Sequence, residues 1–181
     1  MRVNLDMDGV TANFMKSACR ILNEPYPATE ENLVYDWLFV KHGREKCHAL
    51  IRGHDFWAHL EKYPWTDELI DIVDTESRGN WMFLTKPMKD PWCYSGKMEW
   101  VMRNYKRHWN RVTIIPQPKS LLASSKKDVL IDDHPKNISE WNEAGGTGVR
   151  WVELGDKFNP DEARIRLDNL RKTLIQIRES Q

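Results

Sequence analysis

Five short apolar segments along the chain predict the strands of a single β-sheet. They comprise residues 2–6, 81–85, 112–115, 128–131 and about 148–154. Short runs rich in Val, Ile, Leu and Phe are typical of parallel strands that are buried on both faces. The first segment alternates polar and apolar residues and is therefore the least typical of the five.

Helical patterns separate these strands. They cover residues 67–76, 96–109 and 135–144, and the last one is followed by Gly145 and Gly146, as expected at the C-terminus of a helix. Strands that alternate with helices form parallel sheets with right-handed crossovers, and ligands bind beyond the carboxyl ends of their strands. We therefore predict an α/β fold with a three-layer, Rossmann-like parallel sheet core.

The interval from residue 14 to residue 65 breaks this alternation. It contains helical stretches and aromatic clusters but no convincing strand. We interpret residues 14–65 as a small helical cap inserted after the first strand, so that residues 1–13 and 66–181 form the core. Residues 161–180 predict an amphipathic helix packed on that core, with its apolar stripe formed by Ile165, Leu167, Leu170, Leu174 and Ile177.

Composition narrows the classes of partner. The 181 residues suffice for one domain with a modest insertion. Lys plus Arg and Asp plus Glu both number 27, so we expect neither a stable nucleic-acid complex nor attraction to a membrane. Three scattered cysteines without a C-x-x-C pair argue against a disulfide framework or a zinc site. Together with the lack of a long apolar stretch, this predicts a soluble, cytoplasmic protein, and a homo-oligomer stays open.

Two pairs of aspartates follow predicted strands. Asp6 and Asp8, in the pattern D-x-D-G, follow the first strand, and Asp132 and Asp133 follow the fourth. Such carboxylates can share a metal ion or divide into a nucleophile and an acid/base, although ordinary turns and calcium loops use the same letters. Asp133 could instead cap the helix that begins near Pro135. Because both pairs fall at one edge of the sheet, we favour a metal site over a cap.

Two further residues could hold a phosphate. Thr85 ends the second strand and offers a hydroxyl group, and Lys119 supplies the positive charge that phosphoryl transfer requires. Taken singly, a threonine in a strand usually reflects β-propensity and a loop lysine is usually solvated. Only their combination with the aspartates suggests a common site.

This ordered set of residues resembles the four motifs of the haloacid dehalogenase (HAD) superfamily of phosphohydrolases. More narrowly, residues 6–14, 83–87 and 129–135 are similar to the 5'(3')-deoxyribonucleotidases, and residues 94–100 resemble the segment that follows their second motif. The likeness spans residues 1 to about 137. It implies that Asp6 is the nucleophile and that Asp8 is the general acid/base, whose backbone carbonyl also binds Mg²⁺.

The resemblance implies roles for the remaining residues too. Asp132 and Asp133 match the late acidic pair, of which one is a direct Mg²⁺ ligand and the other supports it, and we favour Asp133 as the ligand. The matched phosphate-binding residues are Thr85 and Lys119, with Lys86 at a second contact, and the matched residues for the base or sugar are Phe14 and Trp37.

Three departures from the family pattern matter. Lys86 stands where these nucleotidases often have a small hydroxyl residue, and Thr11 stands where an apolar residue is usual. Lys119 lies 13 positions before Asp132, longer than is usual, so Lys126 or Lys127 could hold the phosphate in its place.

We therefore expect a Mg²⁺-dependent phosphomonoesterase that acts on deoxyribonucleoside 5'(3')-monophosphates through an aspartyl-phosphate. A planar base could stack on the aromatic residues of the cap interval, or these could only pack the cap; they are Phe14, Trp37, Phe56 and Trp57. The same chemistry on another small phosphomonoester or on a polynucleotide 3'-phosphate stays open, and the balanced charge disfavours the latter. A non-catalytic nucleotide-binding module is the remaining alternative, although it has no need of Asp8.

Overall fold

The fold is a parallel α/β sheet with helices on both faces, as predicted. The computed structural model describes residues 1–26, 36–152 and 159–180. Its five parallel strands have the order β3-β2-β1-β4-β5. They are β1 (Arg2–Leu5), β2 (Trp81–Thr85), β3 (Val112–Ile114), β4 (Asp128–Asp132) and β5 (Thr147–Arg150). The chain order reverses between β1 and β4, which is where open α/β sheets bind ligands.

The central strand β1 is buried in spite of its polar residues. Val3 and Leu5 are fully buried, and so is Asn4 between them. The Asn4 side chain donates a hydrogen bond of 3.1 Å to the Val129 carbonyl on the neighbouring strand β4. This bond offsets part of the cost of burying an amide, which is why a strand that looks untypical in sequence can occupy the centre of the sheet.

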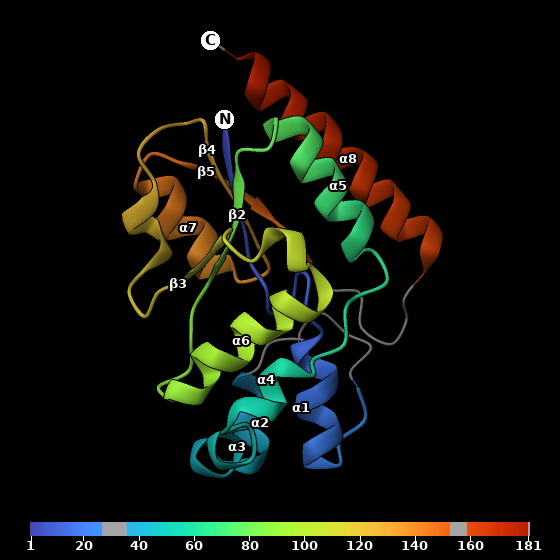
Figure 1. Cartoon of the computed structure of the whole chain (residues 1–181), viewed down its shortest axis with the longest axis vertical. Coiled ribbons are helices and arrows are strands. Elements are labelled where there is room, and N and C mark those ends of the chain that lie inside the picture. The colour runs from blue at the N-terminus through green and yellow to red at the C-terminus, as the bar shows by residue number, and fades with distance from the viewer. Residues whose placement is uncertain (27–35, 153–158, 181) are drawn as a thin grey trace.

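Helices cover the two faces of the sheet (Figure 1). Helices α5 (Thr66–Ser77) and α8 (Pro160–Glu179) pack side by side, and α7 (Pro135–Glu143) lies on the opposite side. On α8, Leu167, Leu170 and Leu174 are buried as expected, whereas Ile165 is 60% exposed. The amphipathic stripe was therefore placed correctly except at the first turns of the helix.

Helix α6 (Pro91–Asn104) begins and ends five residues earlier than predicted. Its start is fixed by Asp90, whose side chain accepts a hydrogen bond from the Trp92 backbone N–H, with Pro91 in the first turn. After α6, Lys106–His108 form a short 3₁₀ turn (η2) rather than a continued α-helix. Strand β5 ends at Arg150, so the predicted strand overran it, and residues 153 and 154 lie outside the described part.

The described residues of the interval 14–65 form four short helices. They are α1 (Phe14–Leu22), α2 (Asp36–His42), α3 (Arg44–Leu50) and α4 (His54–Ala58). Figure 1 shows them gathered beyond the end of β1, next to α6. None of the described residues of this interval adds a strand to the sheet. In the same described part, no helix has the length and apolar character needed to cross a membrane.

Candidate active site

A tight loop fixes Asp6 and Asp8 at the end of β1. The Met7 carbonyl accepts the backbone N–H groups of Val10, Thr11 and Ala12. The buried Thr11 hydroxyl donates to the carbonyls of Asp6 and Met7, each at 3.2 Å. Threonine at position 11 therefore ties the loop together, which explains why a polar residue is accommodated there.

Lys119 connects the carboxyl ends of the neighbouring strands β1 and β4. Its Nζ lies 2.6 Å from Asp6 Oδ1 and 2.7 Å from Asp132 Oδ2, and all three side chains are buried. Burial alone would lower the pKa of Lys119, but the two carboxylates raise it above its usual value, so the ammonium stays charged. Lys126 and Lys127, the alternatives, are exposed in the turn before β4.

The adjacent Asp132 and Asp133 have different surroundings. The carboxylate of Asp132 is enclosed by donors: besides Lys119, it accepts from the His134 backbone N–H at 2.9 Å and from Asn137 Nδ2 at 3.0 Å. Asp133 is half-buried and lines the pocket described below. It does not cap α7, because the N-cap of that helix is His134.

Gly9 makes room for Asp133. Its φ is +77°, a conformation that favours glycine, and a Cβ at this position would lie 2.2 Å from Asp133 Oδ2. The backbone of the first loop therefore touches the carboxylate that follows β4. The glycine of the D-x-D-G pattern brings the two acidic segments together.

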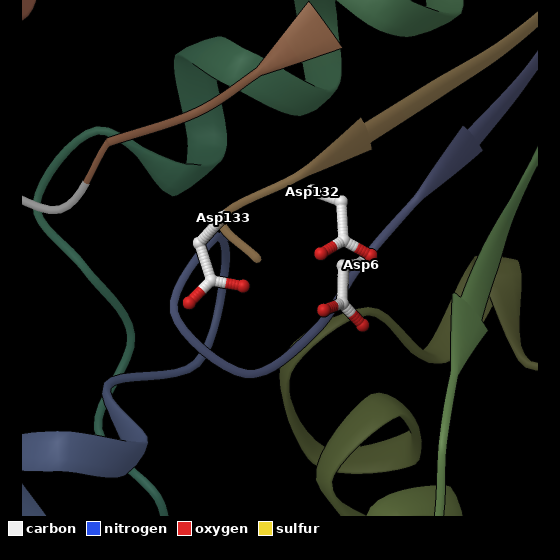
Figure 2. A group of neighbouring side chains, drawn as sticks. All are labelled: Asp6, Asp132 and Asp133. Atoms are coloured by element: carbon white, nitrogen blue, oxygen red, sulfur yellow. The ribbon is translucent and has the colours of Figure 1, made fainter. Parts of the chain in front are cut away.

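The acidic side chains form a group that can hold a cation (Figure 2). One ligand oxygen from each of Asp6, Asp132 and Asp133 lies within 4.8 Å of the others. With Asp8, the site holds four carboxylates against two buried lysines, Lys119 and Lys97. Oxygen ligands with an excess of two negative charges fit a hard divalent cation such as Mg²⁺.

Without a cation, the carboxyl group of Asp6 has a pKa well above the usual value for aspartate. Burial raises the pKa of Asp6 to about 7, and the neighbouring carboxylates of Asp132 and Asp8 act in the same direction against Lys119. A cation beside Asp6 would favour the ionised form, which is the form that can act as a nucleophile.

Sequence reasoning missed the second buried lysine of the site, Lys97 on α6. Its side chain is fully buried, and it forms an ion pair with Asp8 and donates a hydrogen bond of 2.8 Å to Thr85 Oγ1. The segment 94–100 was noted only for its resemblance to a family segment. A fully buried lysine cannot be recognised without knowing what lies above the helix face that carries it.

A pocket of about 360 Å³ opens over this group of charges. Asp6, Asp8 and Asp133 line it, and so does Lys86, whose predicted contact with phosphate stays a prediction. Thr85 and Lys119 are buried and do not line the pocket. Lys119 contacts Asp6 and Asp132 directly, whereas Thr85 contacts Lys97. The end formed by residues 14–65 is lined by Phe14, Met15, Phe39, Arg44, His48, Ile51 and Trp57.

Of the four aromatic residues expected near the ligand, two line the pocket and two do not. Phe14 and Trp57 line the pocket and stack at 5.5 Å with an interplanar angle of 16°. Phe56 lies behind them, edge-on to Phe14 at 5.7 Å, and Trp37 lies under Lys41 Nζ at 5.5 Å. Neither of these two lines the pocket. Phe39, two positions after Trp37, does so instead.

The sheet order matches the fold of the HAD hydrolases. Two solved structures share the fold: a HAD hydrolase, family IA, variant 3 from Entamoeba histolytica (TM-score 0.54, 12% identity, 99% of each chain covered) and a HAD-superfamily hydrolase from Ehrlichia chaffeensis (TM-score 0.50, 14% identity, 97% and 96% covered). The chain belongs to the family described as 5' nucleotidase, deoxy (pyrimidine), cytosolic type C protein, whose model matches residues 1–159. It is therefore a phosphoric monoester hydrolase of the 5'-nucleotidase type. No curated protein sequence matches the chain.

Proposed function

We propose that this protein is a Mg²⁺-dependent phosphatase of deoxyribonucleoside monophosphates, with Asp6 as its nucleophile. The observation that carries the proposal is the group Asp6, Lys119 and Asp132, which lies at the carboxyl ends of β1 and β4 and below a pocket. Asp8 lines the same pocket two residues after Asp6. A nucleophile, an acid/base and fixed positive charge are the parts that phosphoryl transfer needs.

The residues present fit a magnesium ion. Asp6, Asp133 and the backbone carbonyl of Asp8 would hold it, and Asp132 would support the site through Lys119 and Asn137. The ion would neutralise charge on the phosphate dianion, which otherwise repels a carboxylate. The choice of Asp133 over Asp132 as the direct ligand rests on the hydrogen bonds that already surround Asp132.

The chain's own groups would perform two displacements at phosphorus. A carboxylate oxygen of Asp6 forms a bond to phosphorus as the ester P–O bond breaks, and Asp8 gives a proton to the departing oxygen. Asp8 then removes a proton from a water molecule that attacks the aspartyl-phosphate, so that phosphate leaves and Asp6 is regenerated. Throughout, Lys119, Thr85 and Lys86 hold the phosphoryl oxygens.

The far end of the pocket suits a nucleoside. The rings of Phe14, Trp57 and Phe39 offer apolar surface to a planar base, and stacking on an aromatic ring contributes roughly 1–3 kcal/mol per base. Arg44 and His48 add hydrogen-bond donors for base carbonyl groups. We propose that residues 14–65 act as a cap that selects the leaving group, while residues 1–13 and 66–181 supply the chemistry.

A phosphate-release screen tests the proposal. The substrates are dTMP, dUMP, UMP, glucose 6-phosphate and a 3'-phosphorylated oligonucleotide, each with Mg²⁺ and with EDTA. We expect Mg²⁺-dependent release from the nucleoside monophosphates, about tenfold to hundredfold faster in kcat/KM than from glucose 6-phosphate. Equal rates for glucose 6-phosphate would refute the base-binding end of the pocket, and preference for the oligonucleotide would refute the substrate class.

A further inference from the structure

We propose that Lys97 is a positioning residue that orients both the carboxylate of Asp8 and the hydroxyl of Thr85. The proposal rests on the function proposed above. Lys97 lies in the middle of α6 and its side chain has no exposed surface. A buried ammonium is costly unless it is paired and hydrogen-bonded, so its partners are the key to its role.

Lys97 determines the orientation of Asp8. Its ammonium forms an ion pair with Asp8 Oδ2, which is the only hydrogen bond to this carboxylate among the described residues. The other oxygen, Oδ1, is buried and has no hydrogen-bond partner in that part of the chain. Because 26% of the Asp8 side chain is exposed at the pocket, the carboxylate could rotate if Lys97 did not hold it.

The same ammonium sets the direction of the Thr85 hydroxyl. Lys97 Nζ donates to Thr85 Oγ1 at 2.8 Å, so the hydroxyl accepts there and its own hydrogen is left to donate elsewhere. A phosphoryl oxygen is the acceptor that the proposed function places nearby. One buried cation thus couples the proposed acid/base to a proposed phosphate ligand.

Helix packing holds Lys97 in this position. Trp57 of α4 lies over the ammonium, with Nζ 5.0 Å from the ring centroid. Close contact between α4 and α6 depends on Gly96, where a Cβ would lie 2.5 Å from the His54 carbonyl oxygen and 2.7 Å from Trp57 Cβ. Lys97 does not line the pocket. Its ammonium faces Asp8 and Thr85, so we place its action on the substrate through these two side chains.

The first test compares leaving groups in Lys97→Met. Misplacing a catalytic group by about 1 Å costs about 100-fold in rate, so we expect kcat for dTMP to fall about 100-fold while KM changes less than about threefold. With p-nitrophenyl phosphate, whose leaving group needs little protonation, the first-turnover release of p-nitrophenolate should fall less than about fivefold. Lys106→Met, at an exposed lysine of η2, is the matched control and should behave as wild type.

Three results of this comparison would overturn the proposal. A large rise in KM with unchanged kcat would make Lys97 a phosphate ligand. Equal losses for both leaving groups, together with a lower melting temperature, would make it a structural residue only. If the wild-type protein releases no phosphate from any substrate, the proposed function fails first; if wild type is active and Lys97→Met matches it, only this inference fails.

A double variant separates positioning from packing. The loss that Lys97 exerts through Asp8 can occur only once, so Asp8→Asn/Lys97→Met should be less than about fivefold slower than Asp8→Asn alone, the remaining loss arising at Thr85. Multiplied losses would contradict the proposal. The double variant also removes both charges of the pair, so it remains informative if Lys97→Met alone, which leaves Asp8 without its partner, does not fold.

Discussion

Lys119 is the residue on which the electrostatics of the site depend most. It is buried between Asp6 and Asp132, at 2.6 Å and 2.7 Å, and no other ammonium of the described chain contacts either carboxylate. From the sequence, Lys126 or Lys127 could hold the phosphate instead, because the length of the loop before β4 does not show which lysine side chain points into the site. The structure brings Lys119 into the site and leaves the other two in solvent.

The first prediction concerns Lys119→Met, with Lys126→Met as its control. Removing one partner of a buried ion pair typically costs about 3–5 kcal/mol, so we expect a loss of this size in the free energy of unfolding without Mg²⁺. We also expect kcat/KM to fall at least about 100-fold, since the charge that faces the phosphoryl group is lost. Urea denaturation and phosphate release measure the two effects. Normal activity in Lys119→Met, or an equal loss in Lys126→Met, would contradict the assignment.

The second prediction concerns Gly9→Ala. Alanine at a φ of +77° is strained by about 1 kcal/mol, and its Cβ would displace the Asp133 carboxylate. Gly145→Ala is a matched control, because Gly145 has a φ of +94° but nothing within 4 Å of an added Cβ. Both variants should lose similar stability, whereas only Gly9→Ala should weaken Mg²⁺ binding, by about 10-fold or more. Calorimetric titration with Mg²⁺ checks this, and equal affinities would refute the contact's role.

At the scale of elements, the contact between α4 and α6 joins the helices of residues 14–65 to the core. Gly96 permits this contact, and Lys97 and Trp57 meet beneath it.

The third prediction concerns Gly96→Ala. Overpacking against the backbone of α4 should lower the free energy of unfolding by about 1–3 kcal/mol. Ser95→Ala, at an exposed position of the same helix, should change it by less than about 0.5 kcal/mol. Unchanged stability in Gly96→Ala would show that the two helices do not pack this closely.

The elements of the fold could be predicted because each strand and helix carries its own pattern. All five strands and the helices after β2 and β4 were found, since apolar runs and alternation report burial locally. The helix predicted from residue 96 begins at Pro91, where Asp90 and Pro91 give a capping signal. Gly96 lets α6 pack closely against α4. Such contact between helices that are distant in the chain leaves no pattern in the local sequence.

The candidate site could be predicted only where function imposes a motif. Asp6, Asp8, Asp132 and Asp133 were found because strand ends converge at one edge of a parallel sheet. Trp37 and Phe39 both lie on α2, and only the three-dimensional arrangement shows that Phe39 faces the pocket. Lys97 was missed for the same reason, since its burial depends on the docking of α4.

The whole molecule has a net charge of zero, but its candidate site holds four carboxylates and only two lysines. The fourth prediction is that Mg²⁺ stabilises the protein: at 100 times its dissociation constant, a bound ion adds about 2.7 kcal/mol, which corresponds to a rise in melting temperature of roughly 5–10 °C. EDTA should abolish activity and Mg²⁺ restore it, whereas Ca²⁺ should substitute poorly because its coordination shell is larger and looser. Asp133→Asn should lose most of the thermal shift. Full activity in metal-free buffer would refute the metal site.

The central claim, that Asp6 attacks phosphorus, is tested most directly by trapping the intermediate. Asp8→Asn is mixed with p-nitrophenyl phosphate and Mg²⁺, quenched in acid within the first turnover, and digested for mass spectrometry. Because this leaving group departs without the acid but hydrolysis still needs the base, we predict that one phosphoryl group accumulates on the peptide that contains Asp6. In Asp6→Asn, neither the label nor phosphate release should be detectable. An unlabelled peptide in Asp8→Asn together with substantial turnover in Asp6→Asn would contradict the account.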